Sequence, residues 1–292
     1  MTVCIAAINQ EDKLIAFATD RMVTATFPPI EFEHSLPKST PINDYCIALS
    51  AGDALIGKEI FDAVKQTAGE TGRSIAQIAE HTKEIYQRKR LQILEAMHLR
   101  SRGLNHKIFI EAGSKILPPQ MYAQIDHAFA TFMLQVEAII TGIDESGPSI
   151  YGIRNPGLVV CYNSIGFHAI GTGSMHALVS LIETYNPKSS EVETMYSVFR
   201  AKKIAEVAPG VGHETDIGIG NINRKIKFFS KNTEIIKKFN ELYKEEKTAR
   251  KGLIMEEKLN IMGVGDKGEL IAQNNNTKGQ NQPKKIKRGG EE

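Results

Sequence analysis

Strand-like and helix-like segments come in blocks along this chain instead of alternating one by one. Apolar runs predict three groups of strands, at residues 2–8, 14–20 and 45–50, then 135–141, 149–154, 158–162 and 166–170, and finally 215–221 and 225–229. Pairs of helices separate these groups. A doubly wound parallel sheet needs single alternation of strands and helices, so the blocks predict an α+β protein of packed layers, with helices on the outer faces.

The first pair of helices has recognisable start signals. Asp53 and Ser74 stand where a cap is expected, and each precedes apolar residues at helical spacing. The second pair is expected at 174–185 and about 190–207. Residues 104–133 give no clear pattern, because Pro118 and Pro119 interrupt them, although 121–132 fit a short helix.

Composition changes near residue 231. We assign residues 2–230 to one domain with an insertion around 86–133. Residues 231–271 read as a helical extension, since a few apolar residues recur among many Lys and Glu. Residues 272–292 hold too few apolar side chains to order themselves and are expected to be a disordered tail.

Charge and hydropathy exclude several classes of partner. The 36 basic and 34 acidic residues leave a formal net charge of +2, which predicts neither a nucleic-acid nor a membrane partner. No apolar run approaches the roughly 20 residues that cross a bilayer, and no signal core follows the N-terminus. A cytoplasmic protein is expected.

Cysteine and histidine usage argues against a metal or a cofactor. Cys4, Cys46 and Cys161 lie far apart inside apolar, strand-like runs, so isolated buried thiols are expected. The eight His residues show no ligand spacing such as His-Glu-x-x-His.

Thr2 directly follows Met1 and opens the first strand. Methionine aminopeptidase generally removes Met before a small side chain, which would leave a threonine with a free α-amine. An α-amine has an unperturbed pKa of about 7.7 to 8.0 and is able to take the proton of its own hydroxyl. The alternative interpretation is that Thr2 is simply the first residue of a strand.

Four segments in a fixed order carry a family resemblance. They are Thr2 with its strand, LIAFATDRMVT at 14–24, PKSTPINDYCIALSAGDA at 37–54 and AIGTGSMHA at 169–177, with a weaker fifth match, AKKIAEVAPGVGHETDIGIGN, at 201–221. Together they make the chain resemble proteasome β subunits and the peptidase subunit of the bacterial HslV-type protease, which are N-terminal-nucleophile hydrolases. The resemblance implies a four-layer αββα sandwich, here with an added C-terminal helix.

The resemblance assigns a role to each matching residue. Thr2 is the nucleophile, and its α-amine accepts the proton. Lys38 lies near the hydroxyl and lowers the pKa of hydroxyl and amine, while Asp20 holds Lys38 in place. The backbone N–H of Gly52 faces the oxyanion. The hydroxyls of Thr172 and Ser174 support the amine. Thr24 belongs to the segment whose backbone pairs with substrate, and Ser50 lies at the base of the first specificity pocket.

One part of the family pattern is missing. Many proteasome β subunits carry an Asp followed three residues later by Ser near the fifth segment, whereas this chain reads GVGH at 210–213. Asp216 lies nearby but fits the start of a strand better. The bacterial peptidase also lacks that acid.

The implied activity is that of a threonine-type endopeptidase. It would hydrolyse peptides or unfolded proteins inside a homo-oligomeric ring, with an ATPase as a candidate regulator. Two alternatives stay open, namely an amidase or acylase that acts on small molecules with the same nucleophile, and a catalytically silent scaffold subunit.

Overall fold

The computed structural model describes residues 2–26, 29–34, 37–68, 73–230 and 232–261. The chain divides into two compact units, Met1–Asn240 and Glu241–Glu292. The first unit combines helices with strands whose pairings are all antiparallel within the described residues. The α+β class expected from the sequence is therefore confirmed.

One five-stranded sheet carries the N-terminus. Its strand order is β10-β1-β2-β11-β12. The strands are β1 (Cys4–Asn9), β2 (Leu14–Asp20), β10 (Phe167–Ile170), β11 (Thr215–Asn221) and β12 (Arg224–Phe229). β1 and β2 are buried at every position, because α6 (Glu191–Ala205) covers one face and the second sheet covers the other. The helix α5 (Ser174–Thr184) packs beside α6.

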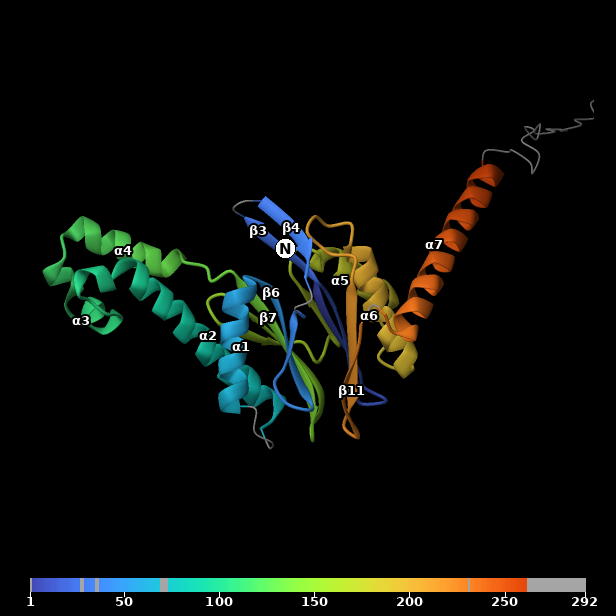
Figure 1. Cartoon of the computed structure of the whole chain (residues 1–292), viewed down its shortest axis with the longest axis horizontal. Helices are drawn as coiled ribbons and strands as arrows, with labels where there is room; N and C mark the ends of the chain where they lie inside the picture. Colours follow the sequence, from blue (N-terminus) through green and yellow to red (C-terminus); the bar gives the residue numbers. More distant parts are fainter. Residues whose placement is uncertain (1, 27–28, 35–36, 69–72, 231, 262–292) are drawn as a thin grey trace, which may run out of the picture. The chain divides into compact units, whose positions relative to one another are not determined.

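The second five-stranded sheet has the order β5-β6-β7-β8-β9. Its strands are β5 (Ser39–Pro41), β6 (Cys46–Gly52), β7 (Val136–Asp144), β8 (Gly147–Arg154) and β9 (Leu158–Cys161). The helices α1 (Ala54–Ala68) and α2 (Ile75–His98) pack on its outer face, and Figure 1 shows α5 and α6 on the opposite side of the paired sheets. Apolar side chains from both sheets fill the space between them, among them Cys4, Ala6, Ile8, Phe17, Leu49, Ile139 and Ile150.

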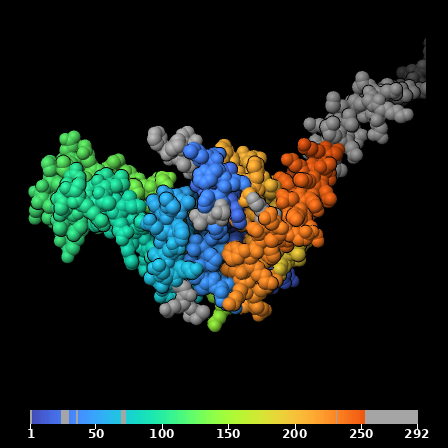
Figure 2. Space-filling view, in the orientation of Figure 1, coloured from blue at the N-terminus to red at the C-terminus, as the bar shows by residue number. Residues whose placement is uncertain are grey.

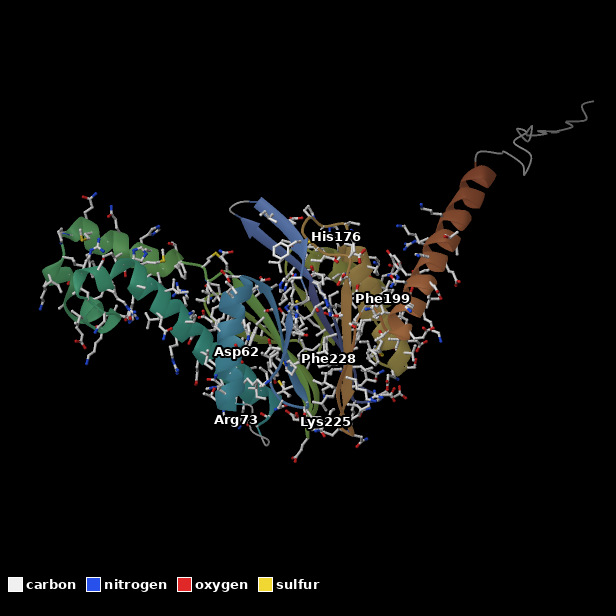
Figure 3. All side chains as sticks on the ribbon, viewed as in Figure 1. Asp62, Arg73, His176, Phe199, Lys225 and Phe228 are labelled. Carbon is white, nitrogen blue, oxygen red and sulfur yellow. The ribbon has the colours of Figure 1, made fainter. Side chains whose placement is uncertain are left out.

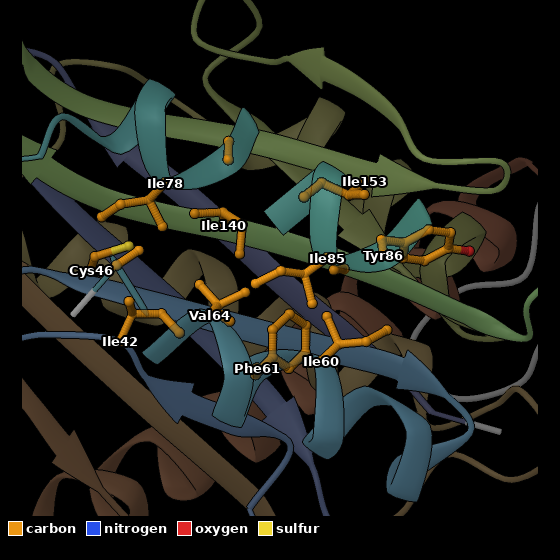
Figure 4. Close-up of a cluster of buried hydrophobic side chains, with 14 of the residues drawn as sticks. Ile42, Cys46, Ile60, Phe61, Val64, Ile78, Ile85, Tyr86, Ile140 and Ile153 are labelled. Atoms are coloured by element: carbon orange, nitrogen blue, oxygen red, sulfur yellow. The ribbon is translucent and has the colours of Figure 1, made fainter. Parts of the chain in front are cut away.

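A second apolar cluster joins α1 and α2 to the outer face of β6, β7 and β8. Figure 4 shows Phe61, Val64, Ile85 and Tyr86 interleaved with strand residues such as Ile140. Both helices begin where the sequence predicts. The Asp53 carboxylate accepts the first N–H groups of α1, and Ser74 forms a capping box with Gln77 at the start of α2.

The segment that the sequence left unassigned is helical. A 3-10 turn, η1 (Arg100–Arg102), leads to α3 (His106–Ile116) and α4 (Pro119–Thr131). The helix expected at 121–132 is present and begins at Pro119, where a proline fits the first helical turn. These helices form their own small cluster around Leu99, Phe109 and Ile125. The sequence analysis did not assign α3, because Pro118 and Pro119 interrupt the region that contains it.

Residues 21–37 show mixed character in the sequence, with Pro28 and Pro29 expected to mark a loop, and the structure has two short strands in this segment. They are β3 (Met22–Thr26) and β4 (Pro29–Glu33), which pair only with each other among the strands that the structure describes. Of the two prolines expected to mark a loop, Pro28 lies outside the described residues. Pro29 is the first residue of β4, a position that tolerates its missing N–H.

The expectation of three buried cysteines is wrong for one of them. Cys4 and Cys46 are buried, but Cys161 is exposed. It is the last residue of β9, an edge strand whose middle residues are half-buried and whose two end residues are exposed. An apolar run alone does not reveal that its strand will lie at an edge.

The last helix within the described residues is α7 (Glu234–Ile261), and the boundary between the two units falls inside it, after Asn240. Within the first unit, Phe239 packs against Phe199 of α6, with ring centroids 5.5 Å apart; Figure 3 labels Phe199. The tail expected at 272–292 lies outside the described residues. None of the helices in the described ranges combines the length and apolar character that a membrane span requires.

The α1 cluster predicts a contrast between two substitutions on one helix. Phe61 is 1% exposed, so Phe61→Ala should lower the free energy of unfolding by about 3–5 kcal/mol through lost contacts and a cavity. Leu55 is 73% exposed, and Leu55→Ala should change the free energy of unfolding by no more than about 0.5 kcal/mol. Urea denaturation of both variants measures the difference. Equal losses would contradict the packing described for α1.

Candidate active site

Thr2 is held at the open end of β1 by the turn between β10 and α5. The pairing of Cys4 with Ile170 brings the first residues beside this turn. The Thr2 backbone N–H donates to Oγ1 of Thr172 at 3.1 Å, and the Thr2 carbonyl accepts the N–H of Gly173 at 3.2 Å. The Thr2 residue is only 2% exposed. Thr2 is therefore fixed in place.

Gly171 shows how closely this turn approaches Thr2. Its φ of +89° is a left-handed conformation, and a Cβ built there would lie 2.4 Å from the Thr2 carbonyl oxygen. Its N–H donates to the Glu137 carboxylate at 3.1 Å. Glu137 lies on β7, so this contact ties the turn to the second sheet.

Asp20 ends β2 and accepts hydrogen bonds from several directions. Its Oδ1 accepts the Thr2 hydroxyl at 2.5 Å and the Val3 N–H at 3.0 Å. Its Oδ2 accepts the N–H groups of Met22 at 3.0 Å and Gly212 at 2.9 Å. The carboxylate is fully buried, and these donors replace the water that it loses.

Lys38 reaches this carboxylate from the second sheet. It stands just before β5, where its carbonyl accepts the N–H of Ser50 at 2.9 Å. Its ammonium donates to Oδ1 of Asp20 at 2.9 Å and also to the Thr2 hydroxyl oxygen. The side chain is 12% exposed. Thr2, Asp20, Lys38 and Thr172, which the sequence analysis grouped together, thus form one connected cluster.

Two opposing effects set the charge on Asp20. Burial raises the pKa of its carboxyl, while the positive charge of Lys38 lowers it, as do hydrogen bonds from Lys38, Thr2 and Gly212. The net pKa lies below the ordinary aspartate value. Asp20 is therefore a carboxylate at neutral pH, and the Thr2 hydroxyl lies between an anion and a cation.

Gly52 ends β6 with a φ of +101°, and the chain then turns into α1. A Cβ built at Gly52 would lie 2.1 Å from the Gln135 carbonyl oxygen, so no other residue fits this backbone. This constraint explains the small-residue turn that precedes the helix. The oxyanion role of the Gly52 N–H stays a prediction.

The remaining candidate residues lie around the cluster. Ser50 is half-buried, and a Cβ added at Gly57 of α1 would lie 3.4 Å from Ser50 Cβ. Ser174 is the first residue of α5, and its N–H donates to the Gly171 carbonyl at 3.0 Å. Thr24 lies on β3 opposite Glu31, and its side chain lies outside what the structure describes. The roles assigned to these three residues stay predictions.

The sequence analysis missed the contribution of the chain after α6. It noted an absent acid at 210–213, yet Gly212 of this stretch donates its N–H to Asp20. Glu33 of β4 accepts the N–H groups of His213 and Glu214 from the same stretch, at 2.6 and 2.8 Å. In Figure 2 the blue hairpin adjoins the gold-coloured chain at and after α6. Backbone donors leave no residue-type signal, so the sequence offered no means to find them.

Comparisons with known proteins give no family assignment. No family model matches the chain, and none of the curated proteins matches it in sequence. The geometry of the cluster is therefore the basis for assigning a function.

The lowered pKa of Asp20 predicts a pH-dependent contribution to stability. A carboxyl with a lower pKa in the folded than in the unfolded state stabilises the fold above about pH 4, and this stabilisation is lost as the pH falls through the folded-state value. Asp20→Asn should lower the free energy of unfolding by about 1–3 kcal/mol at pH 7. The difference from the parent protein should shrink in urea titrations below about pH 4.

Asp62→Asn is the matched control for this measurement. Asp62 is 46% exposed and pairs with Lys58 on α1, and such surface pairs contribute only about 0–1 kcal/mol. The charge state assigned to Asp20 would be contradicted if Asp20→Asn lowered the free energy of unfolding at pH 7 by no more than Asp62→Asn does. It would also be contradicted if the loss for Asp20→Asn stayed the same below about pH 4.

Proposed function

We propose that this protein is a threonine-type hydrolase of the N-terminal-nucleophile class, with Thr2 as the nucleophile. The observation that carries the proposal is the position of the Thr2 hydroxyl, in hydrogen-bond contact with both the Asp20 carboxylate and the Lys38 ammonium. The proposal requires removal of Met1, which frees the α-amine of Thr2. The packing of α1 and α2 on one sheet and α6 on the other supports a four-layer αββα arrangement.

The charges around Thr2 fit the needs of a self-activating nucleophile. A hydroxyl is weakly nucleophilic at neutral pH unless a base accepts its proton. The α-amine of Thr2 is that base in the proposed mechanism, and Thr172 Oγ1 accepts a hydrogen bond from this nitrogen. The Lys38 ammonium favours the alkoxide that develops on Thr2 and the neutral form of the amine. Asp20 holds Lys38 through a 2.9 Å contact.

The reaction would be acyl transfer in two stages. Thr2 Oγ1 attacks the carbonyl carbon of the amide, and its proton passes to the α-amine. The tetrahedral intermediate collapses to an ester on Thr2, and the α-ammonium gives its proton to the departing amine. Water then attacks the ester, with the α-amine taking a proton from it. The bond between the acyl carbon and Thr2 Oγ1 breaks, the carboxylic acid leaves, and the α-ammonium returns its proton to Oγ1 and restores the Thr2 hydroxyl. The Gly52 N–H is the proposed donor to the oxyanion in both stages.

Peptides are the proposed substrates. The β3–β4 hairpin begins two residues after Asp20, and within the described residues its strands pair only with each other. An unpaired strand edge beside a nucleophile is suited to align an extended peptide through backbone hydrogen bonds. An acylase acting on small amides has no need of such an edge. Comparing the turnover of peptide and small-amide substrates separates these two candidates.

The proposal also includes assembly into a homo-oligomeric ring, with an ATPase as a candidate regulator. The assembly is supported by three apolar side chains at helical spacing on one face of α5. Met175, Val179 and Ile182 are 70%, 63% and 73% exposed. An apolar stripe of this kind is typical of a surface that contacts another protein. Native mass spectrometry tests whether the purified protein is an oligomer.

The nucleophile assignment predicts a covalent label at one residue. Intact mass of protein from its native source should show that Met1 is absent. A threonine-directed electrophile, such as a β-lactone or an epoxyketone, should then add to Thr2, as located by peptide mass spectrometry. Thr2→Ala should abolish the label, whereas Thr2→Ser, which keeps a hydroxyl, should retain it. Retained Met1, or a label that survives in Thr2→Ala, would refute the proposal.

The role of Lys38 predicts a loss of reactivity without a loss of the nucleophile. Lys38→Met should slow labelling of Thr2 by about 100-fold or more, because no cation then favours the developing alkoxide. Lys58→Met is the control, since Lys58 is an exposed lysine that pairs with Asp62 on α1. Labelling rates at pH 7 compare the two. A rate for Lys38→Met close to that of the control would remove Lys38 from the mechanism.

A further inference from the structure

Lys202 is a cation that the proposed mechanism does not use, and it is fully buried. It lies near the end of α6, on the part of the helix that packs against the N-terminal sheet. Its ammonium donates to Oε1 of Glu206 at 2.7 Å and to the carbonyl oxygen of Gly212 at 2.7 Å. The side chain is 0% exposed. A buried lysine held by a backbone carbonyl calls for an explanation.

Gly212 connects this lysine to the candidate active site. Its carbonyl accepts from Lys202, while its N–H donates to Oδ2 of Asp20 at 2.9 Å. The backbone C=O and N–H of Gly212 are therefore both hydrogen-bonded, one to Lys202 and the other to Asp20. The stretch after α6 is thereby fixed between the helix and the Asp20 carboxylate.

Keeping Lys202 charged in this position is costly. Burial lowers the pKa of its ammonium to about 8, although the Glu206 carboxylate acts in the opposite direction. An apolar side chain of similar length would fill the space without that desolvation cost, and buried ion pairs are often replaceable in this way without loss of stability. Stability of the fold alone does not explain the lysine.

The charged and titratable groups near Lys202 include the Asp20 carboxylate of the candidate site. Glu206 and Lys203 belong to the end of the same helix, and His213 contacts the other oxygen of Glu206 at 3.0 Å. Asp20 on β2 is close enough to act on Lys202 electrostatically. Asp20 thus has a cation on either side, with Lys38 in direct contact and Lys202 beyond Gly212.

We propose that Lys202 is a positioning residue for the Thr2 site, which fixes Gly212 so that its N–H holds the Asp20 carboxylate in register with Lys38 and Thr2. This inference rests on the proposed function, because its effect is read out at Thr2. Loss of Lys202 frees the Gly212 carbonyl, lets the stretch at 210–213 move and removes one donor from Asp20. A small displacement of a group that orients a nucleophile is able to cost about 100-fold in rate.

Two neighbouring lysines provide a matched test. Lys203 binds the same Oε1 of Glu206 at 2.6 Å, whereas the lysine that donates to the Gly212 carbonyl is Lys202. Lys202→Met and Lys203→Met are each compared with the parent protein, by the rate at which a β-lactone labels Thr2 and by the midpoint of thermal unfolding. We expect Lys202→Met to label at least about tenfold more slowly, while its unfolding midpoint is unchanged or raised. Lys203→Met should label at the parent rate.

The pH profile separates positioning from a merely structural role. In the parent and in Lys202→Met alike, labelling should rise as the Thr2 α-amine loses its proton. In the parent alone, a decline should be added as the pH rises through about 8, where Lys202 loses its proton. Lys202→Met should lack that decline. A parent-like rate and profile in Lys202→Met would overturn the inference, as would a slower rate explained entirely by unfolded protein.

The two proposals fail in distinguishable ways. A parent protein that takes no label at Thr2 contradicts the proposed function itself. A labelled parent together with an equally reactive Lys202→Met contradicts only the role of Lys202. Should Lys202→Met not fold, Lys202→Gln gives the same comparison, since glutamine is neutral but still able to donate to the Gly212 carbonyl. We expect it to lose the decline near pH 8 and to keep part of the parent rate, and a parent-like profile would overturn the inference.

Discussion

The Asp20 carboxylate is the shared acceptor on which the organisation of the site depends. It receives a hydroxyl from Thr2, an ammonium from Lys38 and backbone N–H groups from Val3, Met22 and Gly212. These donors come from both sheets and from the stretch after α6. A fully buried carboxylate is tolerated only when such donors replace its hydration, so the segments that supply them must meet at one place. Burial and ion pairing therefore define the geometry around Thr2 together.

The strand order explains why this meeting point lies at the end of the sheets. Thr2 precedes β1 and Asp20 ends β2, and antiparallel pairing of these neighbours brings the start of one beside the end of the other. Lys38 precedes β5, whose pairing with β6 sets it opposite Ser50. The apolar residues between the sheets hold the two ends at a constant separation. The contact between Lys38 and Thr2 thus depends on packing far from the polar groups.

Residue type and spacing predicted those parts of the molecule that depend on side chains. The apolar runs located β1 and β2, the caps located α1 and α2, and the family resemblance grouped Thr2, Asp20 and Lys38. The sequence did not predict α3, because Pro118 and Pro119 interrupt its region, although the apolar residues of α3 follow a helical pattern. Nor did it predict the exposure of Cys161, because an edge strand and a central strand have similar composition. Features set by neighbours in space leave little trace in a single sequence.

The stretch after α6 illustrates the same limit within the site. Many proteasome β subunits, which the sequence resembles, have an acidic residue where this chain has GVGH at 210–213. Judged by residue type alone, this chain lacks a group that those subunits have. The structure instead places a backbone N–H of Gly212 on Asp20 and a buried lysine on the Gly212 carbonyl. A backbone N–H carries no net charge, unlike an acidic side chain. Another group must therefore hold the Gly212 N–H in the orientation in which it donates to Asp20. Lys202 is the group in contact, and the cost of its burial is reasonable only if that orientation matters.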